Sequence, residues 1–381
     1  MFERLFSLPL DSQHSYFIFG PRGTGKTSWL REKLPNAIYI DLLDATDYRE
    51  FQALPTRLAT RIPPGYTGWV IIDEIQKVPT LLNEVHRLIE LFKYRFILTG
   101  SSARSLRRQG VNLLAGRALI KHMHPLTCQE IKDKFNLLFT LDYGCLPAVF
   151  GHEYPKHYLE SYVQTYLREE VLQEGLTRNI SLFSRFLEIA SFSQGEVINY
   201  TAIARETGSN RHTICNFFDI LEDLLLAYRL PIFTKRSKRE MITHPKFYYF
   251  DTGVYRTIRP MGLLDTPAEA QGAALETFFL QEIKALNDYF DLKYTISYWR
   301  TRTQLEVDFI LYGEKGFHAF EIKRTSNVTK QDLKGLQAFL EDYPEAQAYL
   351  LYGGSKTYWE NDIQVIPFVE VLPQLLKFIQ G

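Results

Sequence analysis

The stretch that decides the fold of this chain is Gly20-Pro21-Arg22-Gly23-Thr24-Gly25-Lys26-Thr27, which is followed directly by Ser28. Its spacing is that of a phosphate-binding loop, G-x-x-x-x-G-K-[ST]. The apolar residues 16–19 precede the loop as a predicted strand, and residues 28–33 follow it as a predicted helix. Since strand, loop and helix in this order are the context in which the motif binds phosphate, we predict an α/β fold with a parallel sheet.

The residues of this loop have complementary roles in binding a nucleotide. Glycines let successive backbone N–H groups curve around phosphate oxygens, and the following helix directs its positive N-terminal end toward them. Lys26 can reach the β- and γ-phosphates, and the Thr27 hydroxyl can ligate Mg²⁺. The sequence therefore predicts ATP and Mg²⁺ as cofactors, with ATP bound by Gly20, Pro21, Arg22, Gly23, Thr24, Gly25, Lys26, Thr27 and Ser28.

A second motif places two carboxylates at the end of an apolar run. Residues 69–72 are apolar and lead into Asp73 and Glu74, as expected of a buried parallel strand that ends at the carboxyl edge of its sheet. Asp73 there would hold Mg²⁺ through water, and Glu74 would polarise the water that attacks the γ-phosphate. The alternative is a strand followed by an acidic helix N-cap. Because a complete phosphate loop lies upstream, we favour nucleotide binding and expect hydrolysis.

The first third of the chain alternates between strand and helix patterns. Apolar residues at helical spacing predict an amphipathic helix over 81–92. The predicted strands cover residues 16–19, 37–41, 69–73 and 95–99, with a candidate fifth strand at 117–123. This alternation indicates a parallel sheet with helices on its faces.

Polar residues follow the fourth predicted strand. In P-loop ATPases a polar side chain at this edge can contact the γ-phosphate or the attacking water, so Thr99 is a further catalytic candidate and Ser101 its alternative. A strand-to-helix turn with serine as N-cap explains the same residues without a catalytic role. Beyond a basic segment at 101–110, Arg117 is a candidate arginine finger acting from a neighbouring subunit, or else an ordinary ion-pair residue.

Length and composition limit the class of protein. A chain of 381 residues should form about two or three domains, and we expect boundaries that give 1–150, 151–255 and 256–381. With 44 basic and 44 acidic residues the net charge is zero, so any contact with nucleic acid must be local. Cys128, Cys145 and Cys215 have no metal-binding spacing and are expected to be reduced thiols. We see no signal peptide and no membrane-spanning run, and expect a soluble cytoplasmic protein with no membrane partner.

Helical patterns dominate from about residue 155 to 230. Residues 200–218 resemble a helix-turn-helix, with a glycine turn at Gly208 and a second helix that begins near Ser209. The strand-like segments 228–234 and 247–251, joined by a basic turn, would form a wing. The polar side chains that would then contact DNA are Asn210, Arg211, His212 and Asn216. A protein–protein scaffold or lid is the alternative use of this module.

The C-terminal segment carries a second chemical pattern. The strand-like runs 305–311 and 317–323 flank a glycine turn and predict a hairpin. Glu321 and Lys323, two apart on a strand, share a face, and Asp308 on the partner strand can lie beside them. In a restriction-endonuclease-like fold Asp308 and Glu321 would bind Mg²⁺ and Lys323 would position the water, with Glu276 as a further metal ligand. An exposed strand with an ordinary Glu–Lys pair is the alternative.

Taken in order, these segments resemble a large prokaryotic family of AAA-type P-loop ATPases with a C-terminal domain of unknown function. The resemblance covers almost the whole chain and rests on segments 20–27, 71–79, 98–102, 113–117, 124–126, 158–167, 246–253 and 306–323. It implies ATP binding and hydrolysis, a winged helix over 151–255 and a restriction-endonuclease-like domain over 256–381. It also strengthens the interpretation of Arg117 as an arginine finger.

Three functions follow from these expectations. The first is a Mg²⁺-dependent ATPase whose nucleotide state repositions the winged-helix and nuclease-like modules. The second is an ATP-gated switch that binds DNA or a protein with negligible turnover. The third is an ATP-regulated, metal-dependent DNA nuclease that uses Asp308, Glu321 and Lys323. A homo-oligomer or a protein partner is compatible with each.

Overall fold

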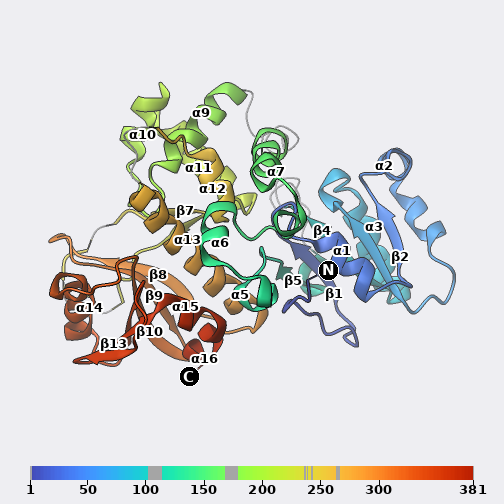
Figure 1. Cartoon of the computed structure of the whole chain (residues 1–381). Helices are drawn as coiled ribbons and strands as arrows, with labels where there is room; N and C mark the ends of the chain where they lie inside the picture. The colour runs from blue at the N-terminus through green and yellow to red at the C-terminus, as the bar shows by residue number, and fades with distance from the viewer. Residues whose placement is uncertain are drawn as a thin grey trace. The chain divides into compact units, whose positions relative to one another are not determined.

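The computed structural model describes residues 2–101, 114–167, 179–262 without 236, 238 and 242, and 267–380. The chain divides into two compact units. The phosphate-loop unit comprises Arg4–Pro125 and Asp223–Leu225, and the C-terminal unit comprises Met1–Glu3, Leu126–Glu222 and Leu226–Gly381. Figure 1 shows the first in blue to cyan and the second in green to red.

The phosphate-loop unit contains a sheet of five parallel strands in the order β2-β3-β4-β1-β5. The strands are β1 (Ser15–Phe19), β2 (Ile38–Asp41), β3 (Trp69–Asp73), β4 (Arg95–Gly100) and β5 (Ala118–His122). The helical segments are α1 (Lys26–Lys33), α2 (Ala45–Ala53), η1 (Pro55–Arg61), η2 (Ile75–Lys77), α3 (Leu81–Phe92) and η3 (Leu114–Gly116). All five predicted strands and the helix predicted over 81–92 are confirmed to within one residue at each end.

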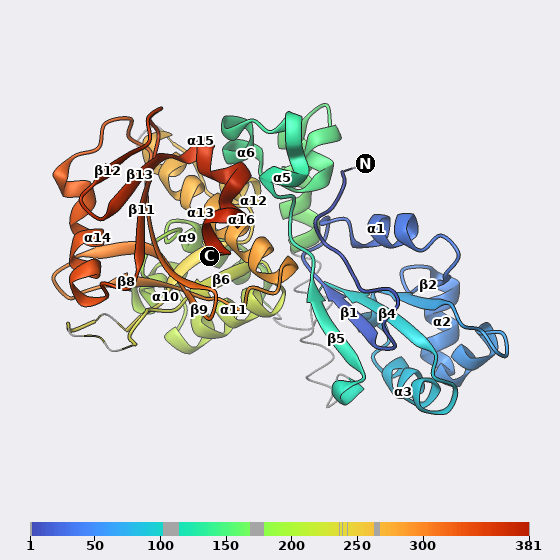
Figure 2. The same cartoon turned by 90° about the horizontal axis from the view of Figure 1, so that it is seen from below.

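The core of this unit explains why its central strands are continuous apolar runs. Strands β1 and β3 are buried along their whole length, because helices cover both faces of a parallel sheet. Helix α3 contributes a stripe of buried residues at helical spacing, namely Leu81, Leu82, Val85 and Leu88. Since all strands run in one direction, the residues that follow β1, β3 and β4 meet at one edge of the sheet. Figure 2 shows β1, β4 and β5 of this sheet as arrows.

The N-terminal half of the C-terminal unit is helical, as the sequence predicts. Helix α10 (Tyr200–Thr207) is followed by Gly208, whose φ of 69° is left-handed, and α11 (Arg211–Asp223) begins three residues later, so a short glycine turn joins the two helices that the sequence predicts. Strands β6 (Ala227–Leu230) and β7 (Lys246–Tyr249) pair antiparallel. The helical segments are α5 (Cys128–Ile131), η4 (Lys132–Lys134), α6 (Leu137–Tyr143), η5 (Pro147–Gly151), α7 (Pro155–Ser161), η6 (Tyr162–Leu167), α9 (Ile180–Ser191), α10 (Tyr200–Thr207), α11 (Arg211–Asp223) and α12 (Thr252–Ile258).

The second half of this unit is built on a mixed six-stranded sheet in the order β12-β13-β11-β10-β9-β8. The hairpin predicted at 305–323 is confirmed, because β9 and β10 pair antiparallel. The strands are β8 (Thr295–Arg300), β9 (Glu306–Gly313), β10 (Gly316–Lys323), β11 (Gln347–Tyr352), β12 (Tyr358–Glu360) and β13 (Ile363–Pro367). The helical segments are α13 (Pro267–Tyr289), α14 (Lys330–Asp342), α15 (Phe368–Val371), η7 (Leu372–Gln374) and α16 (Leu375–Ile379).

Helix α14 lies close against β9. A Cβ at Gly335 would be 1.9 Å from the carbonyl oxygen of Glu306, so only glycine lets the helix backbone approach the strand this closely. The core below α14 is rich in aromatic residues, among them Trp299, Phe339 and Tyr343. This packing fixes the first residues of β9, which carry two of the acidic side chains of the candidate site.

The thiols agree with the expectation of reduced cysteines. Cys128 and Cys145 are buried, Cys215 is half-buried, and all three are free thiols. Within the described ranges, no helix combines the length and the apolar character needed to cross a bilayer.

Candidate functional site

The phosphate loop owes its curvature to glycines in left-handed backbone conformations. Gly23 has a φ of 82° and Gly25 a φ of 93°, a region that residues with a Cβ rarely adopt. Helix α1 begins directly after Gly25, so the unpaired N–H groups of its first turn adjoin the loop. The local sequence therefore builds an anion-binding helix start, as the motif predicts.

Two further contacts hold the loop in place. A Cβ at Gly20 would lie 2.2 Å from the carbonyl oxygen of Met123, so glycine is required where the loop leaves β1. The guanidinium of Arg4 donates to the carbonyl oxygens of Thr24 (2.7 Å) and His124 (2.6 Å). Sequence reasoning missed Arg4, because it lies outside the motif.

The side chain of Lys26 is held inside the curve of the loop. Its Nζ donates to the carbonyl oxygens of Gly20 (2.7 Å) and Pro21 (3.2 Å), and the residue is buried. Within the same loop Arg22 is half-buried and Ser28 is exposed. The structure thus gathers the predicted ATP-binding residues 20–28 around a buried ammonium group.

Asp73 is the centre of the polar network at this edge of the sheet. One carboxylate oxygen, Oδ2, accepts from the Thr27 hydroxyl at 2.7 Å and from the Tyr39 hydroxyl, and the other, Oδ1, accepts from the Thr99 hydroxyl. Burial and the neighbouring Asp73 carboxylate raise the pKa of Tyr39, so its hydroxyl stays a donor. Tyr39 on β2 was not predicted. The feature that could have identified Tyr39 is its position on β2, the strand that pairs with β3.

The donors at this edge fit a magnesium ion. The Thr27 hydroxyl and the Asp73 carboxylate offer hard oxygen ligands 2.7 Å apart. Mg²⁺ prefers such oxygens, completes its octahedron with water and phosphate oxygens, and needs only one or two protein ligands. The geometry is therefore compatible with the Mg²⁺ ligands predicted from the sequence.

Glu74 follows Asp73 in a strained backbone conformation. Its φ of 60° is left-handed, which is uncommon for a residue with a side chain. Its N–H donates to the Thr99 hydroxyl at 3.1 Å, and its carboxylate accepts from the Gln76 amide, which also donates to Ser101 Oγ at 3.2 Å. Thr99 and Ser101, the two candidates at the end of this strand, both belong to this buried network.

Arg117 lies away from the phosphate loop of its own chain. Its carbonyl oxygen accepts from the N–H of Ser15 at 3.2 Å, which places it beside the start of β1, whereas the loop follows the end of β1. Its guanidinium pairs with Glu90, and this hydrogen bond lowers the pKa of the Glu90 carboxyl. Arg117 thus forms an ordinary ion pair with Glu90, the alternative given above. Its role as an arginine finger in a neighbouring subunit stays a prediction. Residues 102–113 lie outside the described residues.

The C-terminal unit brings the second predicted group together. Asp308 on β9 and Glu321 on β10 are neighbours, since the Asp308 N–H donates to Glu321 Oε2 at 3.3 Å. The Ile322 N–H donates to Asp308 Oδ2 at 3.0 Å. Lys323 Nζ lies 2.6 Å from Glu321 Oε1, so these two side chains share a face of the sheet, as their spacing predicts.

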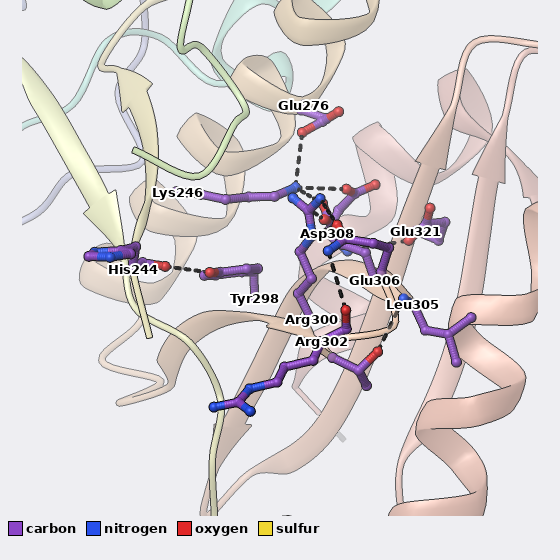
Figure 3. Close-up of polar contacts among 12 residues, drawn as sticks. His244, Lys246, Glu276, Tyr298, Arg300, Arg302, Leu305, Glu306, Asp308 and Glu321 are labelled. Carbon is purple, nitrogen blue, oxygen red and sulfur yellow. Dashed lines mark hydrogen bonds and ion pairs between the residues drawn. The ribbon is translucent and has the colours of Figure 1, made fainter. Parts of the chain in front are cut away.

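Three residues that the sequence did not single out as site residues complete this cluster, namely Lys246, Arg300 and Glu306. Lys246 of β7 directs its Nζ to the carboxylates of Glu306 and Asp308, the latter at 3.2 Å, and lies 3.9 Å from Glu276 on α13 (Figure 3). Arg300 pairs with the other oxygen of Glu306 at 3.1 Å. The acidic partners lie 30 or more residues from Lys246 in the sequence, so no local pattern reveals the contact.

The ionisable groups of this cluster are strongly perturbed. Burial, with a contribution from Asp308, raises the pKa of Glu276 to about 8 and that of Glu321 to about 8. Burial alone would lower the pKa of Lys246, but Tyr248 and the surrounding carboxylates, Asp308 first among them, keep it well above its usual value. Lys246 is therefore a permanent cation in this site.

The arrangement does not fit a divalent cation. Among the residues that the structure describes, no three acidic, histidine or cysteine side chains form a group able to hold a metal ion. The expected ligand set of Glu276, Asp308 and Glu321 does not form, because the Lys246 ammonium contacts Glu276 and Asp308, and backbone N–H groups contact Asp308 and Glu321. The nuclease role of Lys323 stays a prediction.

The helix-turn-helix presents the polar residues proposed for DNA contact. Asn210, Arg211, His212 and Asn216 are exposed. Asn210 Oδ1 accepts from the Thr213 N–H at 2.9 Å, so the N-cap of α11 lies one residue after Ser209. His212 and Asn216 contact each other at 3.3 Å. DNA binding and the winged-helix assignment stay predictions.

Three segments of the chain match known domain families. Residues 12–132 match an AAA domain, residues 134–265 a domain of unknown function (DUF8612), and residues 271–371 another domain of unknown function (DUF4143). The chain is also similar to uncharacterized proteins of Mycobacterium tuberculosis and Mycobacterium bovis. Each is 27% identical over 366 residues, which cover 93% of this chain and 80% of the relative.

More distant similarities extend to other organisms. An uncharacterized Haemophilus influenzae protein is 24% identical over 229 residues, or 55% of this chain and 56% of the relative. The Aeropyrum pernix Orc1 protein, solved in complex with DNA, is 13% identical, with 64% of this chain and 86% of that chain covered at a TM-score of 0.26. A solved Vibrio cholerae protein is 10% identical, and the match covers 96% of this chain and 98% of that chain at a TM-score of 0.24. At these TM-scores neither structure bears on the fold.

The AAA match includes the phosphate loop, Asp73, Glu74 and Thr99, the residues that meet at the carboxyl edge of the parallel sheet. Residues 12–132 therefore match an AAA domain, which is P-loop ATPase-like, and residues 271–371 match a DUF4143 domain.

Proposed function

We propose that this protein binds ATP with Mg²⁺ and hydrolyses it. The observation that carries the proposal is the Asp73 carboxylate, which accepts hydrogen bonds from Thr27 of the loop and Thr99 of β4. Asp73 thereby joins the phosphate loop to the strand edge that bears Glu74. AAA domains are generally ATPases, and the match over residues 12–132 supports the same activity here.

Each residue has a defined task in the proposed reaction. The loop N–H groups and the Lys26 ammonium would bind the phosphates. Thr27, and Asp73 through water, would hold Mg²⁺, which would neutralise negative charge on the phosphates. Glu74 accepts a proton from the attacking water. The Thr99 hydroxyl orients both acids, because it donates to the Asp73 carboxylate and accepts from the Glu74 backbone N–H.

Two substitutions separate binding from turnover. Lys26→Ala should abolish ATP binding, measured with a fluorescent ATP analogue, because the loop loses its buried cation. Glu74→Gln should bind ATP like the wild type and release no phosphate above background, because an amide accepts no proton from water. Glu32→Gln, an exposed change on α1, is the matched control and should behave as wild type. Wild-type turnover in Glu74→Gln would contradict the role given to Glu74.

We further propose that the nucleotide state controls the downstream modules, with DNA as the partner of the helix-turn-helix. The exposed Arg211, His212 and Asn216 on α11 support DNA contact. Fluorescence anisotropy of labelled duplex DNA, with and without a slowly hydrolysed ATP analogue, measures the coupling. Substitution of all three residues by alanine should abolish DNA binding. If the wild-type protein does not bind DNA either, a protein partner is favoured.

The other two functions predict different outcomes of the same experiments. ATP binding without phosphate release would identify a switch with negligible turnover. Plasmid nicking with Mg²⁺ or Mn²⁺ that is lost in Glu321→Ala would identify a nuclease. The placement of the Lys246 ammonium on Asp308 favours the ATPase and the switch over the nuclease.

A further inference from the structure

Lys246 is the most deeply buried charge in the acidic cluster of the C-terminal unit, the cluster being Glu276, Glu306, Asp308 and Glu321. Only 2% of its side chain is exposed. It does not belong to the sheet or helix that carries the four acids. It comes from β7, whereas the acids lie on α13, β9 and β10. Figure 3 shows the ammonium group directed between the carboxylates of Glu276 and Asp308.

The position of Lys246 is fixed by its neighbours. Strand β7 pairs with β6, and the Tyr298 hydroxyl of β8 donates to the carbonyl oxygen of His244, two residues before Lys246. The Lys246 Nζ also lies 5.7 Å from the centre of the Tyr298 ring, a favourable cation–π contact. The backbone and the aromatic ring therefore hold the ammonium in the cluster.

Protein cations contact every acidic side chain of the cluster. The four carboxylates face the cations of Lys246, Lys323 and Arg300. The oxygens of Asp308 are directed at the Lys246 ammonium and the Ile322 N–H. Those of Glu306 are directed at Lys246 and Arg300. Converging carboxylate oxygens are also the ligands that a hard divalent cation prefers.

We infer that Lys246 is the built-in cation of this cluster and takes the place that a divalent cation would otherwise take. The electrostatics of buried acids explain the arrangement. Asp308 and Glu306, two residues apart on β9, both direct carboxylate oxygens at Lys246, and buried carboxylates need such a cation to remain ionised. A lysine supplied by another segment of the same chain provides that cation at every metal concentration. The cluster is then stable without metal. The described residues hold no ready-made group of three ligands, so a divalent cation binds only after removal of the lysine side chain lets the carboxylates close around it.

Binding of Mn²⁺ alone tests this inference, and it is independent of the proposed ATPase activity. All proteins carry Asp73→Asn, which silences the predicted metal site of the phosphate loop. Bound Mn²⁺ is counted by electron paramagnetic resonance. Relative to the Asp73→Asn parent, added Lys246→Met should gain one Mn²⁺ site, with affinity at least about tenfold tighter than any binding by the parent. Further addition of Asp308→Asn should remove the gained site.

Matched variants establish whether the gained site depends on Lys246 itself. Lys284→Met removes a lysine of the same unit whose Nζ lies over the Tyr228 ring instead, and it should gain no Mn²⁺ site. Thermal melting checks folding, and Mn²⁺ should raise the melting temperature of Lys246→Met but not that of the parent. If Lys246→Met fails to fold, Lys246→Gln takes its place. Asp308-dependent Mn²⁺ binding by the parent, or no gain in either Lys246 variant, overturns the inference.

Discussion

Thr99 is the residue whose removal tests the organisation of the nucleotide site most directly. Its hydroxyl donates to Asp73 and accepts from the Glu74 N–H at 3.1 Å, and the residue is fully buried. Thr99→Val keeps the shape of the side chain and removes both hydrogen bonds. A hydrogen bond to a charged group contributes about 1.5–3 kcal/mol, and a buried N–H left unpaired costs about 1–3 kcal/mol.

These two terms share one hydroxyl and are not additive, so we expect a loss of about 3 kcal/mol in the free energy of unfolding of the phosphate-loop unit. That loss is roughly a factor of 150 in the equilibrium constant. Urea unfolding measures it. Hydrogen exchange shows where the stability is lost. The peptide that contains Asp73 and Glu74 should exchange faster, because the Glu74 amide loses its hydrogen-bond acceptor. Phosphate release should fall as well, since Glu74 loses the bond that orients it.

Two variants serve as controls for this prediction. Thr99→Ser keeps the hydroxyl and should recover most of the lost stability. Thr60→Val removes an exposed hydroxyl that donates to the Arg57 carbonyl oxygen at 2.8 Å, and it should change stability by less than about 0.5 kcal/mol. If Thr99→Val loses no more stability than Thr60→Val, the hydroxyl does not organise the site and the reasoning is wrong.

Three other predictions concern single residues. Gly20→Ala should cost about 1–3 kcal/mol and weaken ATP binding, because its Cβ would lie 2.2 Å from Met123 O; wild-type melting and affinity would contradict this. The stability of the C-terminal unit should fall as pH rises from about 4.5 to about 8. Over that range the raised pKa values of Glu276 and Glu321 make the folded state bind more protons than the unfolded state. Glu276→Gln should make the stability depend less on pH. Arg117→Ala should leave the melting temperature unchanged, because its ion pair is exposed, but should lower turnover by about 10³-fold if it acts as a finger in a neighbouring subunit; unchanged turnover excludes that role.

The sheet of the phosphate-loop unit could be predicted because its signals are local. Each strand is an apolar run between a loop and a helix, and the motif at residues 20–27 fixes the first of them. The same logic placed Asp73 and Thr99 at one edge, because strands β3 and β4 are parallel neighbours. The hairpin with Asp308 and Glu321 followed from alternation and a glycine turn.

The remaining site residues could not be predicted, because their contacts depend on tertiary structure. Arg4 reaches the loop from a segment with no periodicity, and Tyr39 reaches Asp73 only because β2 lies beside β3. Lys246 meets Asp308 across 62 residues of sequence. Arg117 begins the predicted fifth strand, but its place at the edge opposite the phosphate loop follows only from the parallel pairing of β5 with β1. The division at residues 150 and 255 stays a prediction.

The Arg4 contact has a mechanical consequence for the phosphate-loop unit. One guanidinium ties the middle of the loop, at Thr24, to His124, which immediately precedes the end of the unit's main segment at Pro125. Met123 also contacts Gly20, where the loop starts. The chain thus leaves this unit at a point fastened to the loop on two sides. We therefore expect any movement of Thr24 on phosphate binding to disturb the hydrogen bond that holds His124.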